Sequence, residues 1–141
     1  MQANNHILIA EDDLDDRNFI TKAFEENGKR ESINFFSCGP TLLKHLDTLL
    51  PDHTPPLIVL DYRMPLLNGL ETLQNIRKHP VHSQVPVVVF SSFLFPEIEQ
   101  QLKNLDILCY LKKGTNFQKL IEQVRFFTEL ISDDVETLLG I

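Results

Sequence analysis

The sequence predicts an α/β protein built on a doubly wound, five-stranded parallel sheet. Five short apolar runs alternate with five segments whose apolar residues recur at helical spacing. Runs such as Leu57–Leu60 and Val87–Phe90 do not alternate apolar with polar residues, which is typical of strands covered on both faces. Strands of this kind that alternate with helices indicate a parallel sheet between two layers of helices.

The first two units each consist of a strand followed by a helix. The run at Ile7–Ala10 predicts the first strand, and a helix is expected from about Asp15 to Asn27, where Asn27-Gly28 is a stop signal. The run at Ile33–Phe36 predicts the second strand. The next helix is opened by a proline, carries leucines on one face as far as Leu50, and is expected to end at Pro51.

The third and fourth units follow the same pattern. Leu57–Leu60 predicts a strand, and its helix must stop near His79 because proline follows at position 80. The run at Val87–Phe90 predicts the fourth strand. The helix after it, expected over Pro96–Leu105, has a thin apolar stripe.

The fifth unit has the clearest helical signal. Its strand is expected over Ile107–Leu111, and its helix is expected to start at Thr115 or Asn116 and to run to Ile131. Thr115 and Gln118 have the spacing of a capping box, in which two side chains satisfy free backbone amides at a helix start.

Length and composition indicate one domain. The 141 residues, 43% of them apolar, are enough for one core, so the prediction is a single domain over residues 1–141 with a core of about 6–131 and a C-terminal extension at 132–141. A net charge of −7 argues against binding nucleic acid through phosphates. With neither a signal peptide nor a membrane-spanning run, the chain is expected to be soluble and cytoplasmic, with no membrane partner.

Polar residues follow the apolar runs where four of the five predicted strands end. Right-handed crossovers place the carboxyl ends of parallel strands on one edge of the sheet, where ligands bind near the reversal of strand order. A group of carboxylates at such an edge suits Mg²⁺, and a neighbouring lysine and hydroxyl suit phosphate. These residues are Glu11, Asp12 and Asp13, then Asp61, then Ser91 and Ser92, then Lys113.

Four motifs in register carry a family resemblance. "ILIAEDDLDDR", "LIVLDYRMPLLNG", "VVVFSS" and "YLKKG" occur in that order, and together they resemble the CheY-like receiver domain of response regulators in two-component signalling. The resemblance runs from about His6 to Ile131. It implies a flavodoxin-like (βα)5 receiver fold and a stand-alone, single-domain regulator without an attached effector domain.

The resemblance also implies a role for each acidic residue. Asp61 would accept a phosphoryl group from a histidine kinase or a histidine phosphotransfer protein. Mg²⁺, with Mn²⁺ as a substitute, would be held by Asp12 directly, by Glu11 through water, by Asp61 and by the main-chain carbonyl of Arg63. Such a protein is not an enzyme beyond its own phosphorylation and dephosphorylation.

The remaining implied roles concern the signal. Lys113 would pair with the phosphoryl oxygens, Ser91 would move toward them, and Tyr110 would turn inward into the vacated space. This change would alter the face formed by the fourth helix, fifth strand and fifth helix, where a downstream protein reads the signal. The apolar residues Phe93–Phe95 are expected to belong to that contact surface, and a monomer or a weak homodimer is expected.

One position departs from the family pattern. Receivers usually carry proline after the lysine, often through a cis peptide bond, whereas Gly114 follows Lys113 here. A cis bond before a residue other than proline costs roughly 2.5–4 kcal/mol, so the geometry of this loop is left open by the sequence.

Two other functions compete with this interpretation. A receiver-like binding module that is never phosphorylated would fit the Gly114 departure. A Mg²⁺-dependent hydrolase with an aspartyl-phosphate intermediate would need a second acid two residues after the nucleophile, where this chain has Arg63, and a cap over its substrate.

Overall fold

The computed structural model describes residues 6–28, 33–52 and 54–131, and it contains the predicted alternation of strands and helices. The strands are β1 (Ile7–Ala10), β2 (Ile33–Phe36), β3 (Leu57–Leu60), β4 (Val87–Ser91) and β5 (Cys109–Lys112). The helices are α1 (Leu14–Glu26), α2 (Gly39–Leu46), α3 (Gly69–Arg77), α4 (Pro96–Lys103) and α5 (Phe117–Ile131). The predicted C-terminal extension at 132–141 lies outside the described residues.

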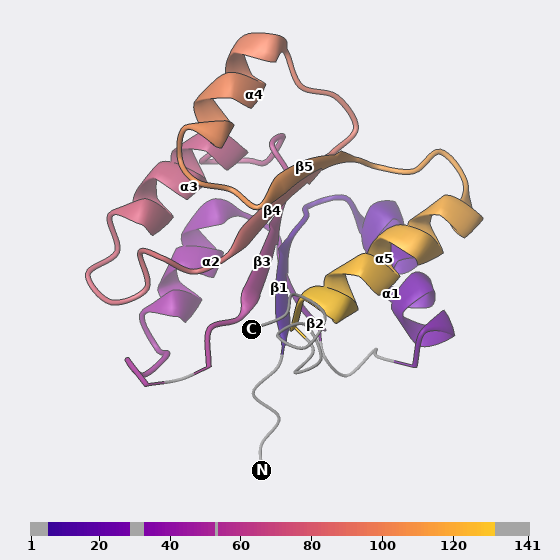
Figure 1. Ribbon diagram of the computed structural model, residues 1–141, viewed down its shortest axis with the longest axis horizontal. Coiled ribbons are helices and arrows are strands. Elements are labelled where there is room, and N and C mark those ends of the chain that lie inside the picture. Colours follow the sequence, from indigo (N-terminus) through magenta and orange to yellow (C-terminus); the bar gives the residue numbers. More distant parts are fainter. Residues whose placement is uncertain (1–5, 29–32, 53, 132–141) are drawn as a thin grey trace, which may run out of the picture.

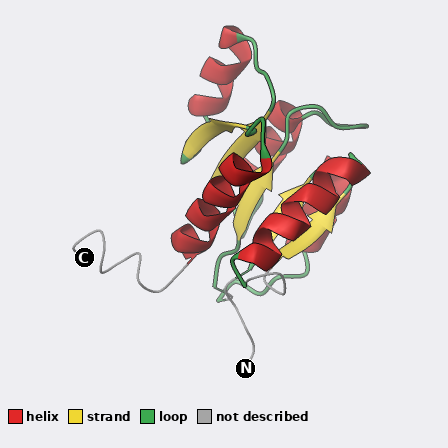
Figure 2. Ribbon diagram, turned by 90° about the vertical axis from the view of Figure 1, so that its right-hand side faces the viewer, coloured by secondary structure: helices red, strands yellow, loops and turns green. Residues whose placement is uncertain are grey.

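The five strands form one parallel sheet in the order β2-β1-β3-β4-β5. Helices α2, α3 and α4 lie on one side of the sheet, and α1 and α5 lie on the other (Figure 1). Figure 2, turned by 90°, shows the same layers from the side. The prediction of a doubly wound five-stranded sheet is therefore confirmed.

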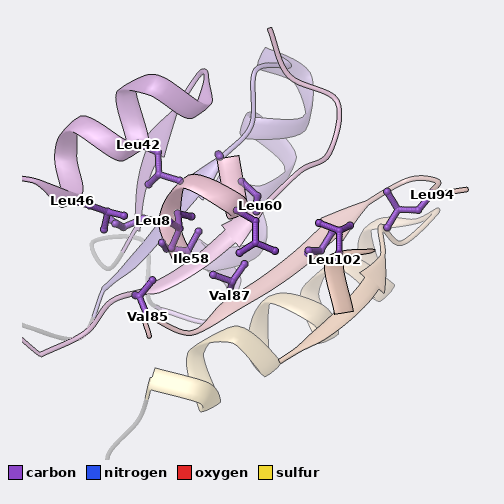
Figure 3. Close-up of a cluster of buried hydrophobic side chains, with 13 residues drawn as sticks. Leu8, Leu42, Leu46, Ile58, Leu60, Val85, Val87, Leu94 and Leu102 are labelled. Atoms are coloured by element: carbon purple, nitrogen blue, oxygen red, sulfur yellow. The ribbon is translucent and has the colours of Figure 1, made fainter. Parts of the chain in front are cut away.

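The sheet separates two apolar clusters, and β1 supplies alternate residues to both. Leu8 and Ala10 pack with leucines of α2, α3 and α4, whereas Ile7 and Ile9 pack with α1 and α5. In the first cluster the side chains of Leu8 and Leu42 meet from the sheet and from α2 (Figure 3). Continuous burial of the central strands thus explains why their sequences do not alternate apolar with polar residues.

Helix α2 is shorter than the leucine pattern predicts. It ends at Leu46, not at Pro51, because the hydroxyl of Thr48 donates to the carbonyl of His45 at 2.6 Å and the Thr48 amide donates to the same oxygen at 2.9 Å. These local hydrogen bonds replace the helical pattern. Leu50 is consequently 67% exposed and adds nothing to the core.

Two further boundaries differ in the last unit. Strand β5 begins at Cys109, not at Ile107, because Asp106 takes a left-handed φ of 60° and pairing with β4 begins at Cys109. Helix α5 begins at Phe117. The side chain of Asn116 accepts from the Lys119 amide at 2.8 Å, so Asn116 caps the helix. The helix thus starts one residue after Asn116 and two after Thr115, the two predicted starts, and the predicted capping box at Thr115 was wrong.

Across the described part of the chain, the structure contains no helix with both the length and the apolar content needed to cross a lipid bilayer.

Candidate functional site

The site lies at the carboxyl edge of the sheet, where the strand order reverses. Strand β1 lies between β2 and β3, so the chain leaves β1 toward one side and returns to pair on the other. Side chains that follow β1 and β3 therefore face one crevice. The structure brings together four of the predicted residues there: Glu11, Asp61, Ser91 and Lys113.

Asp61 lies at the centre of these contacts. It directly follows β3, is 7% exposed, and its own amide donates to the Ala10 carbonyl of β1 at 3.2 Å. One carboxylate oxygen, Oδ1, accepts from the Ser91 hydroxyl at 2.8 Å and from the Tyr62 amide at 2.7 Å. The other oxygen, Oδ2, accepts from Nζ of Lys113 at 2.9 Å. Both oxygens are thus oriented by fixed donors.

The start of α3 supports the backbone of Asp61. Asn68 and Glu71 form a complete capping box, with the Asn68 side chain accepting from the Glu71 amide at 2.8 Å. The Gly69 amide donates to the Tyr62 carbonyl at 2.7 Å, and a Cβ at position 69 would lie 2.6 Å from the Asp61 carbonyl oxygen. Only glycine permits this close approach, so Asn68-Gly69 is part of what holds Asp61 in place.

Lys113 joins three carboxylates. Its Nζ lies 2.6 Å from Glu11 Oε1, 2.8 Å from Asp16 Oδ2 and 2.9 Å from Asp61 Oδ2. Burial opposes the charge on Lys113, but its hydrogen bond to Asp16 and the attraction of Asp61 and Glu11 outweigh burial and raise the pKa of Lys113 above the ordinary value. Lys113 therefore remains a cation, and its ammonium is held against Oδ2 of Asp61.

Glu11 is fixed through its backbone as well as its side chain. Its carbonyl accepts from Nε of Arg17 at 2.7 Å, its amide donates to Phe36 at 2.9 Å, and its Oε2 accepts from the Asp13 amide at 3.2 Å. The residue is only 2% exposed. Burial raises its pKa to about 7, although the hydrogen bond from Lys113 favours the charged form.

The predicted metal ligands are only partly assembled. Across the described residues, no three His, Cys, Asp or Glu side chains already form a group that can hold a metal ion. Glu11 and Asp61 nevertheless contact one ammonium, and Asp12 is exposed directly after Glu11. These oxygens are of the kind that Mg²⁺ prefers, so the donor chemistry fits a hard divalent cation.

The predicted switch residues lie in contact with each other. The Tyr110 hydroxyl donates to the Ser91 carbonyl at a long 3.4 Å, while Ser91 itself is 1% exposed. Burial raises the pKa of Tyr110, and the carboxylates of Glu99 and Asp61 raise it further, so the phenol remains a donor. A chain of contacts thus connects Asp61 through Ser91 to the half-buried Tyr110 on the edge strand β5.

Only part of the apolar segment after β4 is exposed at the surface. Phe93 and Phe95 are 59% and 63% exposed, and their rings pack edge to face with centroids 5.1 Å apart. Leu94 is buried in the cluster beneath α4, which corrects the prediction that all three residues belong to a contact surface.

Two residues of the site were missed from the sequence. Asp16 lies in the first turn of α1, where an acid is favourable by itself, but it also contacts Lys113. Gln123 contacts the backbone on both sides of Lys113 from α5. The sequence does carry a signal for Gln123, because this polar residue interrupts the apolar stripe between Leu120 and Val124.

Comparison with known proteins identifies the family. The sequence model of the response regulator receiver domain family matches residues 7–125, which is most of the chain. The chain therefore belongs to the response regulator receiver domain family of two-component signalling.

Individual relatives agree with this assignment. A protein-glutamate methylesterase/protein-glutamine glutaminase of Trichodesmium erythraeum is 33% identical over 129 residues, covering 84% of this chain but only 34% of the relative. The chain thus spans about a third of that relative's length. The rice two-component response regulator ORR12 is 30% identical over 92 residues, covering 65% of this chain and 72% of the relative.

Among solved structures, the phosphorylated cyanobacterial phytochrome response regulator RcpA superposes with a TM-score of 0.77 at 25% identity. The match covers 91% of this chain and 94% of RcpA.

Proposed function

We propose that the chain is a phosphoryl acceptor of two-component or phosphorelay signalling, and that Asp61 is the acceptor. One observation carries the proposal: the Ser91 hydroxyl contacts one carboxylate oxygen of Asp61 and the Lys113 ammonium contacts the other. A carboxylate with a hydroxyl and a cation on opposite oxygens is suited to receive and neutralise a phosphoryl group.

In the proposed transfer, the P–N bond of a phosphohistidine breaks and a P–O bond forms to a carboxylate oxygen of Asp61. The imidazole nitrogen keeps the electron pair and takes up a proton. The donor is a histidine kinase or a histidine phosphotransfer protein. Lys113 pairs with the phosphoryl oxygens, so positioning and neutralisation do most of the catalytic work.

Receiver domains generally bind Mg²⁺ or Mn²⁺. Here Glu11, Asp12, Asp61 and the main-chain carbonyl of Arg63 would hold the ion, which supplies positive charge beside the phosphoryl oxygens when bound. Without it, the Lys113 ammonium is the cation that neutralises Glu11 and Asp61.

Phosphorylation is proposed to act on the chain of contacts from Ser91 to Tyr110. A phosphoryl group on Asp61 changes the hydrogen-bond partner of the Ser91 hydroxyl. The contact of Tyr110 with Ser91 then transmits the change to β5. The face of α4, β5 and α5 then presents the signal to a protein partner, or to a second copy in a weak dimer. Because a kinase takes its phosphoryl group from ATP, we propose that the chain acts in the cytoplasm.

The proposal is tested by incubating the protein with Mg²⁺ and acetyl phosphate and weighing it by intact mass. One added phosphoryl group is expected in the wild type and in Asp15→Asn, an exposed acid of α1 that serves as the matched control. Asp61→Asn should gain none. No adduct with any donor would favour the unphosphorylated module, and continuous release of phosphate from monoesters would favour the hydrolase.

A further inference from the structure

Gln123 contacts the backbone on both sides of Lys113. Its Nε2 donates to the Lys112 carbonyl at 2.7 Å, and its Oε1 accepts from the Gly114 amide at 2.9 Å. Both polar ends of the side chain are therefore used, and the residue is 8% exposed. A buried amide on the apolar face of α5 is satisfied entirely by the segment that carries the lysine.

A third hydrogen bond completes the arrangement. The Lys113 amide donates to the Ser91 carbonyl of β4 at 3.0 Å. Backbone groups of residues 112, 113 and 114 are thus fixed from two different elements, α5 and β4. The Lys113 side chain starts from this fixed backbone and reaches Asp61 at 2.9 Å.

Gly114 is matched to Gln123. The Lys113–Gly114 peptide bond is trans, and the glycine supplies an amide hydrogen that proline lacks. A Cβ at position 114 would also lie 2.7 Å from Lys119 Cγ and 3.1 Å from Gln123 Oε1. Gly114 therefore provides the donor that Gln123 requires and the space that Lys119 and Gln123 occupy.

We propose that Gln123 is a positioning residue for Lys113, which together with Gly114 fixes the loop where receivers usually carry proline. Its effect on phosphorylation rests on the proposed function. Gln123 touches neither Asp61 nor the incoming phosphoryl group, so it acts only through the backbone that aims the lysine.

The first test compares phosphorylation rates with acetyl phosphate and Mg²⁺. Gln123→Met keeps the length of the side chain and loses both hydrogen bonds, and it should slow phosphorylation roughly tenfold or more, as expected for a displaced catalytic group. Phe127→Leu, on the same helix and packed against Phe90, is the control for lost stability and should keep the wild-type rate. Rates are measured where circular dichroism shows each variant folded.

A double-mutant cycle separates positioning from a general loss of structure. In the Lys113→Met background, Gln123→Met should cause no further loss of rate, because the group that it positions is gone. A wild-type rate in Gln123→Met, or the same loss of rate in both backgrounds, would overturn the proposal.

A second readout does not depend on phosphorylation. The side-chain ammonium of Lys113 is observed by NMR in protein with ¹⁵N-labelled lysine and is assigned by its absence in Lys113→Met. Its protons should be protected from exchange in the wild type and in Phe127→Leu, and that protection should be lost in Gln123→Met. Unchanged protection would contradict positioning by Gln123, whereas failure to phosphorylate the wild type would refute the proposed function alone.

Discussion

The Asp16 carboxylate lies 2.8 Å from Nζ of Lys113, although the two residues are 97 positions apart in the chain. Helix α1 thus adds a third carboxylate to an ammonium that already contacts Glu11 and Asp61. One cation faces three carboxylates, so the site carries excess negative charge even where Glu11, whose pKa is raised to about 7, is partly protonated. We therefore expect the site to attract a divalent cation and to depend on Lys113 for its stability.

Removal of the Lys113 charge should therefore destabilise the fold when no metal is present. Lys113→Met is expected to lower the free energy of unfolding by about 3–5 kcal/mol, because buried carboxylates lose their partner. Mg²⁺ should raise the melting temperature of this variant more than that of the wild type. Lys112→Met, at the exposed neighbouring position, is the control and should leave both quantities unchanged. Equal stability of Lys113→Met and the wild type in metal-free urea titrations would show that the Lys113 charge does not stabilise the fold.

Gly69→Ala should disturb the backbone that presents Asp61. A Cβ would lie 2.6 Å from the Asp61 carbonyl oxygen and 2.8 Å from the Tyr62 Cα, so the backbone must shift. We expect a loss of about 1–3 kcal/mol in thermal or urea unfolding and slower phosphorylation. The control is Gln74→Ala, at an exposed position of the same helix, which should be neutral or slightly stabilising. Equal stability of the two variants would contradict the close approach.

Thr72→Val should preserve stability or increase it. The Thr72 hydroxyl is buried and has no hydrogen-bond partner among the described residues. Valine has the same shape without the unsatisfied group, so urea unfolding should show a change between zero and about 1 kcal/mol in favour of the variant. Thr72→Ser keeps the hydroxyl and removes the methyl group, and it should cost about 1 kcal/mol. The reverse order of the two variants would show that the hydroxyl is satisfied.

Arg77→Lys should loosen the two loops that precede β4 and β5. The guanidinium donates to four backbone carbonyls, at 2.7 Å to Leu105, 2.9 Å to Ser83, 2.7 Å to Val85 and 3.1 Å to Asp106. Lysine has a single charged nitrogen and cannot reproduce this fork, so about 1–3 kcal/mol of unfolding free energy should be lost.

Hydrogen exchange should localise the change in Arg77→Lys to the two loops at 83–86 and 105–108 and leave phosphorylation intact. Lys78→Arg, at an exposed position, is the control and should behave as the wild type. A uniform increase in exchange across the whole sheet would contradict a local role.

The sequence was sufficient to predict the sheet and the contacts between residues at the strand ends. Glu11, Asp61, Ser91 and Lys113 each follow or end a strand, and a parallel sheet brings such ends together by topology. The end of α2 was predicted too late because hydrogen bonds of Thr48 with His45 compete with helical ones. Such local competition is decided by geometry that apolar periodicity does not contain.

Asp16 and Gln123 were missed for a different reason. Both lie on helices, and their roles depend on which face of the helix meets the loop after β5. An acid in a first helical turn is favourable by itself, so Asp16 needed no other explanation. Gln123 was detectable as a polar residue within an apolar stripe, but the sequence does not show which backbone groups satisfy it.

The most direct measurement locates the phosphoryl group. Protein treated with acetyl phosphate and Mg²⁺ is reduced with borohydride, which converts an aspartyl phosphate to homoserine, and its peptides are then sequenced by mass spectrometry. We expect homoserine at position 61 and at no other acid, and none in untreated protein. Homoserine at Asp12 or Asp13, or a phosphorylated protein with unmodified Asp61, would contradict it.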